Sequence, residues 1–117
     1  MSHDELITRI EELKKEKDAV ICAHYYVDEE VQKISDYVGD SFYLAKVAAN
    51  LKEQTIVFCG VSFMGESAKV LSPEKTILMP DPTADCPMAH MAMVSAIEKY
   101  RKHYDDLAVV CYVNSTA

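Results

Sequence analysis

The strongest constraint on the fold is a set of short apolar runs that alternate with helix-like segments. Four such runs occur in the order AVICA, TIVFCG, TILM and LAVVCYV, at residues 19–23, 55–60, 76–79 and 107–113. Short continuous apolar runs are typical of strands that are buried on both faces of a parallel sheet. Between the runs, apolar residues recur at helical spacing. The alternation predicts an α/β domain in which helices cover both faces of a short parallel sheet.

Local signals indicate where the helices begin and end. Residues 4–17 form an amphipathic segment, and Asp28 is placed to cap a short helix that ends at Gly39. Asp40 or Ser41 is placed to cap the longer helix that follows. Two further helices are expected over residues 62–71 and 87–103, the second either continuous or interrupted.

Length and charge exclude several classes of protein. The 117 residues suffice for one domain, which would bury roughly two thirds of its unfolded surface. A net charge of -7 leaves no basic surplus to neutralise phosphates, so no nucleic-acid partner is expected. No apolar run approaches the roughly 20 residues that span a bilayer. Together with the polar start of the sequence, this predicts a cytoplasmic protein with no membrane partner.

The four cysteines are widely spaced and form no C-x-x-C pair. Disulfides are not expected in the cytoplasm. Cys22, Cys59 and Cys111 lie inside apolar runs, which predicts small buried side chains. Cys86 instead precedes Pro87, a residue favoured at the first position of a helix. Cys86 is therefore expected at an N-cap, either as a structural residue or as a nucleophile or metal ligand.

Polar residues follow each apolar run, where a parallel sheet binds its ligands. These strand-end groups are residues 24–26, 60–62, 81–86 and 114–116. Their convergence predicts one site at the carboxyl edge of the sheet. His24 is placed either for acid–base chemistry and oxygen binding or for a structural hydrogen bond. Only one of Tyr25 and Tyr26 is expected to face the site.

The Gly-Asp-Ser sequence at residues 39–41 allows two interpretations. It can be a simple pair of helix caps. Alternatively, free N–H groups and the Ser41 hydroxyl can bind a carboxylate or phosphate. Neither G-x-G-x-x-G nor G-x-x-x-x-G-K-[ST] occurs, so the common nucleotide fingerprints are missing.

Two segments with a similar sequence pattern bear on domain organisation. AVICAHYY near the start and AVVCYVNS near the end share the pattern A-V-[IV]-C followed by polar or aromatic residues. Parallel strands are all rich in Val and Ile, which is one explanation. The other is that a second, related α/β unit opens at the last run. On that basis we expect residues 1–105 to form a first α/β domain and residues 106–117 the opening strand of a second, within a longer protein.

Four stretches, in this order, resemble the quinolinate synthase family. They are AHYYVDEEVQKISDYVGDS, FCGVSFMGESAKVLSPEK, PDPTADCPMAHM and CYVNSTA. The resemblance implies a three-layer αβα domain, one of three similar domains around a central active site, with this sequence matching about the first third.

The implied reaction condenses iminosuccinate with dihydroxyacetone phosphate to form quinolinate in de novo NAD biosynthesis. The family uses a [4Fe–4S] cluster held by three cysteines, one from each domain, and its open iron acts as a Lewis acid. Cys86 matches the first cluster cysteine. Since the remaining two domains would supply the other ligands, this chain alone is expected to be metal-free and inactive. Val27, Asp85 and Pro87 depart from the usual family pattern around these motifs.

The resemblance also implies roles for individual side chains. His24 and Ser41 match residues that bind the carboxylates of iminosuccinate. His24 and Tyr26 would shuttle protons during the dehydrations and tautomerisations. The residues implied to bind substrate are His24, Asp40, Ser41, Tyr112 and Asn114.

Two other interpretations remain open on the residues alone. A small flavodoxin-like or receiver-like module would use the same strand ends to bind a phosphate or a metal without help from other domains. A structural domain would use its surface polar residues only as helix caps.

Overall fold

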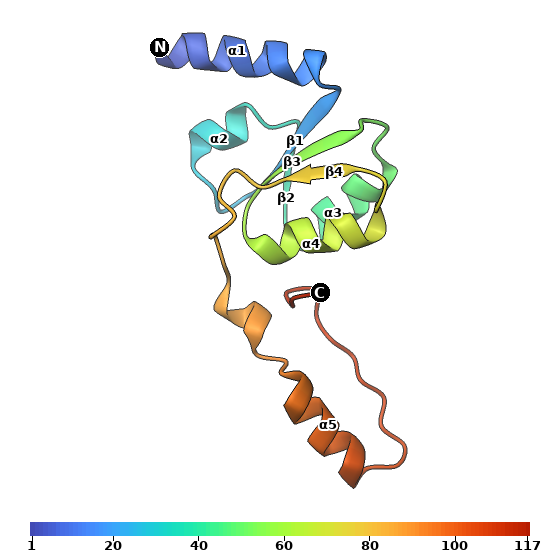
Figure 1. Cartoon of the computed structure of the whole chain (residues 1–117). Helices are drawn as coiled ribbons and strands as arrows, with labels where there is room; N and C mark the ends of the chain where they lie inside the picture. Colours follow the sequence, from blue (N-terminus) through green and yellow to red (C-terminus); the bar gives the residue numbers. More distant parts are fainter.

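A four-stranded, all-parallel sheet with the order β2-β1-β3-β4 forms the centre of the computed structural model, which describes residues 1–117 (Figure 1). The elements in chain order are α1 (His3–Glu16), β1 (Ala19–His24), α2 (Glu29–Lys33), β2 (Tyr37–Gly39), α3 (Ser41–Asn50), β3 (Thr55–Cys59), α4 (Ser62–Leu71), β4 (Thr76–Leu78), the 3₁₀ helix η1 (Pro87–His90) and α5 (Val94–His103). Helices α3 and α4 lie on one side of the sheet and α1 and α2 on the other. The predicted α/β class with a three-layer arrangement is confirmed.

The core lies between the sheet and the pair α3 and α4. Phe58 of β3, Leu44 of α3 and Phe63 of α4 are at most 1% exposed. In β3, buried and half-buried residues alternate, because successive side chains of a strand point to opposite faces. This core fixes β1 and β3 beside each other and so sets the position of their carboxyl ends.

The short helix predicted to continue to Gly39 ends at Lys33, and residues 37–39 form the edge strand β2 instead. The reason is a pair of contacts that lay the chain beside β1. The backbone N–H of Asp36 donates to the carbonyl of Ile21 over 2.8 Å, and the Asp36 carboxylate accepts from the N–H of Ile21 over 2.8 Å. These contacts are tertiary, and the local sequence does not code for them.

Gly39 does not adopt the left-handed conformation that a helix-ending glycine would use. It is needed for a close approach, because the ring of Tyr43 occupies the space of a Cβ at this position. Of the two predicted caps for α3, the structure selects Asp40, whose carboxylate accepts from the N–H of Tyr43 over 2.7 Å. Ser41 is therefore the first residue of the helix.

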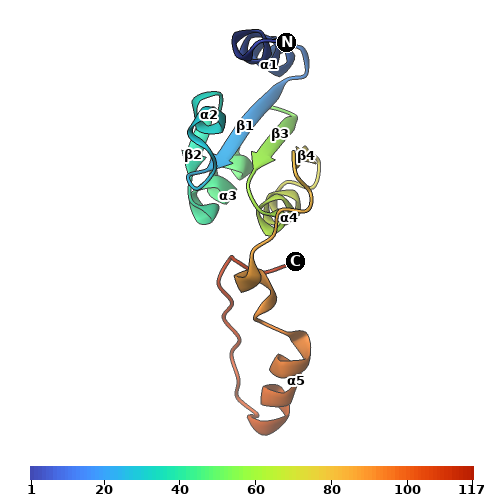
Figure 2. The same ribbon diagram turned by 90° about the vertical axis from the view of Figure 1, so that its left-hand side faces the viewer.

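The last third of the chain leaves the sheet as an arm (Figure 2). The predicted helical stretch is interrupted between η1 and α5. Residues 107–113, predicted as a strand, form no strand because no other strand lies beside them, and Cys111 is exposed instead of buried. The assignment of residues 106–117 to a second domain stays a prediction. No helix has both the length and the apolar composition that a membrane span requires.

Candidate active site

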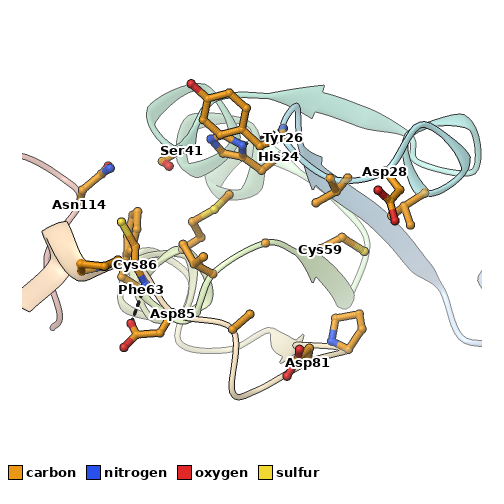
Figure 3. Close-up of a pocket in the computed structure, with 18 residues that line it drawn as sticks. His24, Tyr26, Asp28, Ser41, Cys59, Phe63, Asp81, Asp85, Cys86 and Asn114 are labelled. Atoms are coloured by element: carbon orange, nitrogen blue, oxygen red, sulfur yellow. Dashed lines mark hydrogen bonds between the residues drawn. The ribbon is translucent and has the colours of Figure 1, made fainter.

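The sheet order opens a crevice between two neighbouring strands. The connections that leave β1 and β3 run in opposite directions along the sheet, and such a switch point is where open α/β sheets bind ligands. A cleft of about 640 Å³ lies there (Figure 3). Its lining includes residues that follow β1, β3 and β4, the first residue of α3 and one residue near the end of the chain. The predicted convergence at the carboxyl edge is confirmed.

Five of the seven predicted site residues line this cleft, namely His24, Tyr26, Ser41, Cys86 and Asn114. Asp40 does not line it and serves as the cap of α3. Tyr112 is 69% exposed and lines a separate groove beside α3 and α4. The roles predicted for Asp40 and Tyr112 at the substrate stay predictions.

His24 ends β1 and reaches the cleft with one ring nitrogen already engaged. The backbone N–H of Tyr26 donates to Nδ1 of His24 over 3.1 Å. A ring nitrogen that accepts a hydrogen bond carries no proton, so the neutral imidazole is protonated on Nε2. Burial lowers the pKa of His24, and the charge of Asp40 opposes this only in part. His24 therefore presents an Nε2–H donor to a ligand.

Three aromatic rings cluster at the end of β1. The ring centroids of His24, Tyr25 and Tyr26 lie 4.4 to 4.8 Å apart. The hydrogen bond with Tyr26 raises the pKa of the Tyr25 hydroxyl. Only Tyr26 lines the cleft, as predicted, and it is 81% exposed at the mouth.

Ser41 and Asn114 bring further polar groups to the cleft. Ser41 is 9% exposed, and its hydroxyl makes no hydrogen bond within the chain. The Nδ2 group of Asn114 donates to Sδ of Met88 over 3.6 Å, while its buried Oδ1 has no partner. A buried acceptor without a donor is unfavourable by about 1–3 kcal/mol. The Oδ1 atom of Asn114 is thus an acceptor that a ligand can satisfy.

Cys86 occupies the predicted N-cap position, with Pro87 at the first position of η1. Its side chain is half-buried and faces the same end of the cleft as Ser41 and Asn114 (Figure 3). The carbonyl of Ala84 accepts from the N–H of Ser62 over 2.9 Å, which fastens the preceding loop to the start of α4.

The cleft is polarised, and this feature was not predicted. Donor groups lie at the end near Ser41, whereas Asp28 and Asp81 lie at the opposite end (Figure 3). A third carboxylate, Asp85, lines the cleft beside Cys86, where its Oδ2 lies 2.7 Å from Nε2 of His90. Hydrogen bonds from Thr83 lower the pKa of Asp81, which keeps this carboxylate charged. The sequence marked Asp28 only as a helix cap, yet its side chain makes no capping hydrogen bond. A carboxylate next to a helix start is too common a pattern to indicate a site.

Comparison with known proteins shows which family the chain belongs to. The family model described as quinolinate synthetase A protein matches residues 8–117. The chain belongs to this family. It is 65% identical over 109 residues to the quinolinate synthase of Fusobacterium nucleatum, covering 93% of this chain and 37% of that protein. It is 54% identical to the quinolinate synthase of Clostridioides difficile, covering 97% and 37%, and 52% identical to that of Caldicellulosiruptor bescii, covering 100% and 39%. The chain thus spans little more than a third of these relatives.

The chain's own residues fit one ligand of the iron–sulfur cluster expected for quinolinate synthase, and not a whole cluster. Such clusters are held by cysteine thiolates, and Cys86 brings one to the cleft. No three His, Cys, Asp or Glu side chains lie close enough together to hold a metal ion. Cys59 also lines the cleft, but it lies toward Asp28 and Asp81, and burial raises the pKa of its thiol.

Proposed function

We propose that this chain forms one wall of the active site of a quinolinate synthase. The enzyme would condense iminosuccinate with dihydroxyacetone phosphate to quinolinate, with release of phosphate and water, in de novo NAD biosynthesis. The observation that carries the proposal is the placement of three hydrogen-bonding side chains around one cysteine at the same end of the cleft. These side chains are His24, Ser41 and Asn114, and the cysteine is Cys86.

The polarity of the cleft would orient a dicarboxylate. The Nε2–H of His24 and the hydroxyl of Ser41 are donors for carboxylate oxygens. At the other end, Asp28 and Asp81 repel an anion, whereas the carboxylate of Asp85 near Cys86 is engaged by Nε2 of His90. Because the chain has a net charge of -7, its overall field does not attract an anion, and local donors must supply the attraction. Iminosuccinate would therefore bind at the Ser41 end.

Proton transfers would fall to His24 and Tyr26, with the Nε2–H of His24 as a proton donor, and Asn114 would bind the substrate. Asn114 Oδ1 accepts a hydrogen bond from an N–H or O–H of the substrate, which satisfies its buried oxygen. The Tyr26 hydroxyl at the cleft mouth can exchange a proton with water and with the substrate. His24 in its neutral form stabilises a substrate oxygen by donating from Nε2.

Cys86 would hold one iron of a [4Fe–4S] cluster, the remaining two domains of the protein would each hold one more, and the fourth iron would have no cysteine ligand. When bound, the cluster supplies a Lewis acid for the dehydration chemistry. We also propose that the isolated chain is metal-free and inactive and that the enzyme is cytoplasmic, where four free cysteines are expected.

The cluster assignment is tested with the enzyme extended to the length of its relatives and reconstituted anaerobically. We expect Cys86→Ala to abolish the visible absorption of the cluster and quinolinate formation. Cys111→Ala is the control, because Cys111 does not line the cleft, and it should retain both. A normal cluster in Cys86→Ala would refute the assignment.

A second measurement concerns the 117-residue chain itself. Stoichiometric iron and sulfide in this chain after anaerobic purification would contradict the shared cluster. Tight binding of inorganic phosphate by the isolated chain would instead favour a self-contained phosphate-binding module.

A further inference from the structure

The loop that carries Cys86 is fixed on its N-terminal side. Asp81 closes a tight turn by accepting from the N–H and the hydroxyl of Thr83 over 3.0 and 2.6 Å. The carbonyl of Ala84 then accepts from the N–H of Ser62, the first residue of α4. The chain therefore enters Cys86 from a point that is fixed relative to the sheet.

Asp85 connects the two ends of the short helix η1. Its Oδ1 accepts from the backbone N–H of Cys86 over 2.8 Å, and its Oδ2 lies 2.7 Å from Nε2 of His90. The carbonyl of Cys86 accepts from the N–H of Ala89, a residue of the buried core. The turn around the cysteine is thus closed by its own backbone and by one side-chain bridge.

We propose that Asp85 and His90 are positioning residues for Cys86, and that their bridge holds the thiol toward the cleft. The inference rests on the proposed function only for the role of this thiol as a cluster ligand. Both side chains of the bridge are 51% exposed, and exposed ion pairs contribute little to global stability. Loss of the bridge should therefore free the turn locally and leave the fold intact.

The full chain supplies its own reference for the test. Alkylation with iodoacetamide, followed by peptide mass spectrometry, gives the labelling rate of Cys86 relative to the exposed Cys111. We expect His90→Ala to raise this ratio about two- to five-fold, because the half-buried thiol becomes more accessible. His90→Gln places an amide donor near the position of Nε2 and should restore the ratio. The thermal unfolding midpoint should stay the same in both variants.

Several outcomes would overturn the proposal. One is an unchanged ratio in His90→Ala, or a Gln variant that behaves like the Ala variant. A lower ratio would assign the pair a purely electrostatic effect, since an unpaired Asp85 carboxylate disfavours the thiolate. An unfolded His90→Ala chain would assign the pair to global folding.

A double-mutant cycle provides an independent readout. If the two residues act as one bridge, Asp85→Ala combined with His90→Ala changes the ratio no more than the larger single change. Additive changes would overturn the proposal. Iron content in the assembled enzyme tests the proposed function separately, because the labelling result stands whether or not Cys86 holds iron.

Discussion

The N–H of Tyr26 donates to Nδ1 of His24 over 3.1 Å, so a backbone contact between residues two positions apart decides which tautomer the imidazole adopts. The proton of the neutral ring then lies on Nε2, the nitrogen left for a ligand. This geometry makes His24 a hydrogen-bond donor in its neutral state. A general base would need the opposite arrangement.

The tautomer and its pH dependence are directly measurable. Because burial lowers the pKa of His24 below 6.5, the ring should remain neutral at pH values where an exposed histidine is half-protonated. Because the unfolded chain binds the proton on His24 more readily than the folded chain, stability should rise with pH. The contribution to the free energy of unfolding is fully present above pH 6.5 and is lost as the pH falls through the folded pKa. Long-range ¹H–¹⁵N NMR of the chain checks both points, and an Nδ1–H tautomer or a midpoint above 6.5 would contradict them.

Substitution of Asn114 should weaken substrate binding without lowering the stability of the chain. Asn114→Leu removes the buried Oδ1 that has no donor, so the thermal stability of the chain should stay the same or rise slightly. In the complete enzyme the same change removes an acceptor for substrate, and KM should rise by about ten-fold. Thermal unfolding and steady-state kinetics give the two readouts. A destabilised chain with an unchanged KM would assign Asn114 a structural role.

The predictable parts of the fold are those whose signals are local. The strand at residues 19–24 and the helix at 62–71 follow from apolar runs and turn residues in their own segments. Strand β2 has no such run and depends on the pairing of Asp36 with Ile21, fifteen positions apart. Residues 107–113 have the opposite character, with a strand-like sequence but no strand beside them. A strand needs a partner as well as a propensity.

The site likewise has some residues with local sequence signals and others whose placement depends on tertiary packing. His24 and Cys86 were predictable because strand ends and N-caps are positions where ligands bind. The acidic end of the cleft was predicted only in part: Asp81 belongs to the strand-end group of residues 81–86, whereas Asp28 resembles an ordinary helix cap in the sequence. Their common orientation toward one cleft depends on the packing of α2 and the β4 loop. The difference in charge between the two ends of the cleft therefore depends on tertiary packing and not on the local sequence.

Two phenylalanines provide a matched test of the core. Phe58 of β3 is 1% exposed and belongs to the core between the sheet and helices α3 and α4, whereas Phe42 on α3 is 59% exposed. Phe58→Ala should lower the free energy of unfolding by about 3–5 kcal/mol, because it removes buried apolar area and leaves a cavity. Phe42→Ala should change it by less than about 0.5 kcal/mol. Urea denaturation followed by circular dichroism measures both, and similar losses would contradict the placement of the core.

We expect Asp36 to stabilise the fold as a hydrogen-bond acceptor as well as through its negative charge. Its carboxylate accepts from the N–H of Ile21 over 2.8 Å and from Nζ of Lys14 over 2.9 Å, which ties α1 to the β1–β2 edge. Burial acts to lower the pKa of Lys14, but the hydrogen bonds with Asp36 and Glu11 outweigh it and raise the pKa.

Asp36→Ala leaves both donors without this partner and should lower the free energy of unfolding by about 2 kcal/mol. Asp36→Asn keeps an oxygen for Ile21 and loses only the charge opposite Lys14, so its effect should be about half as large. Urea denaturation of the two variants gives the comparison. Equal losses would mean that the ion pair with Lys14 holds this edge, and no loss in either variant would mean that β2 pairs with β1 without help from the side chain.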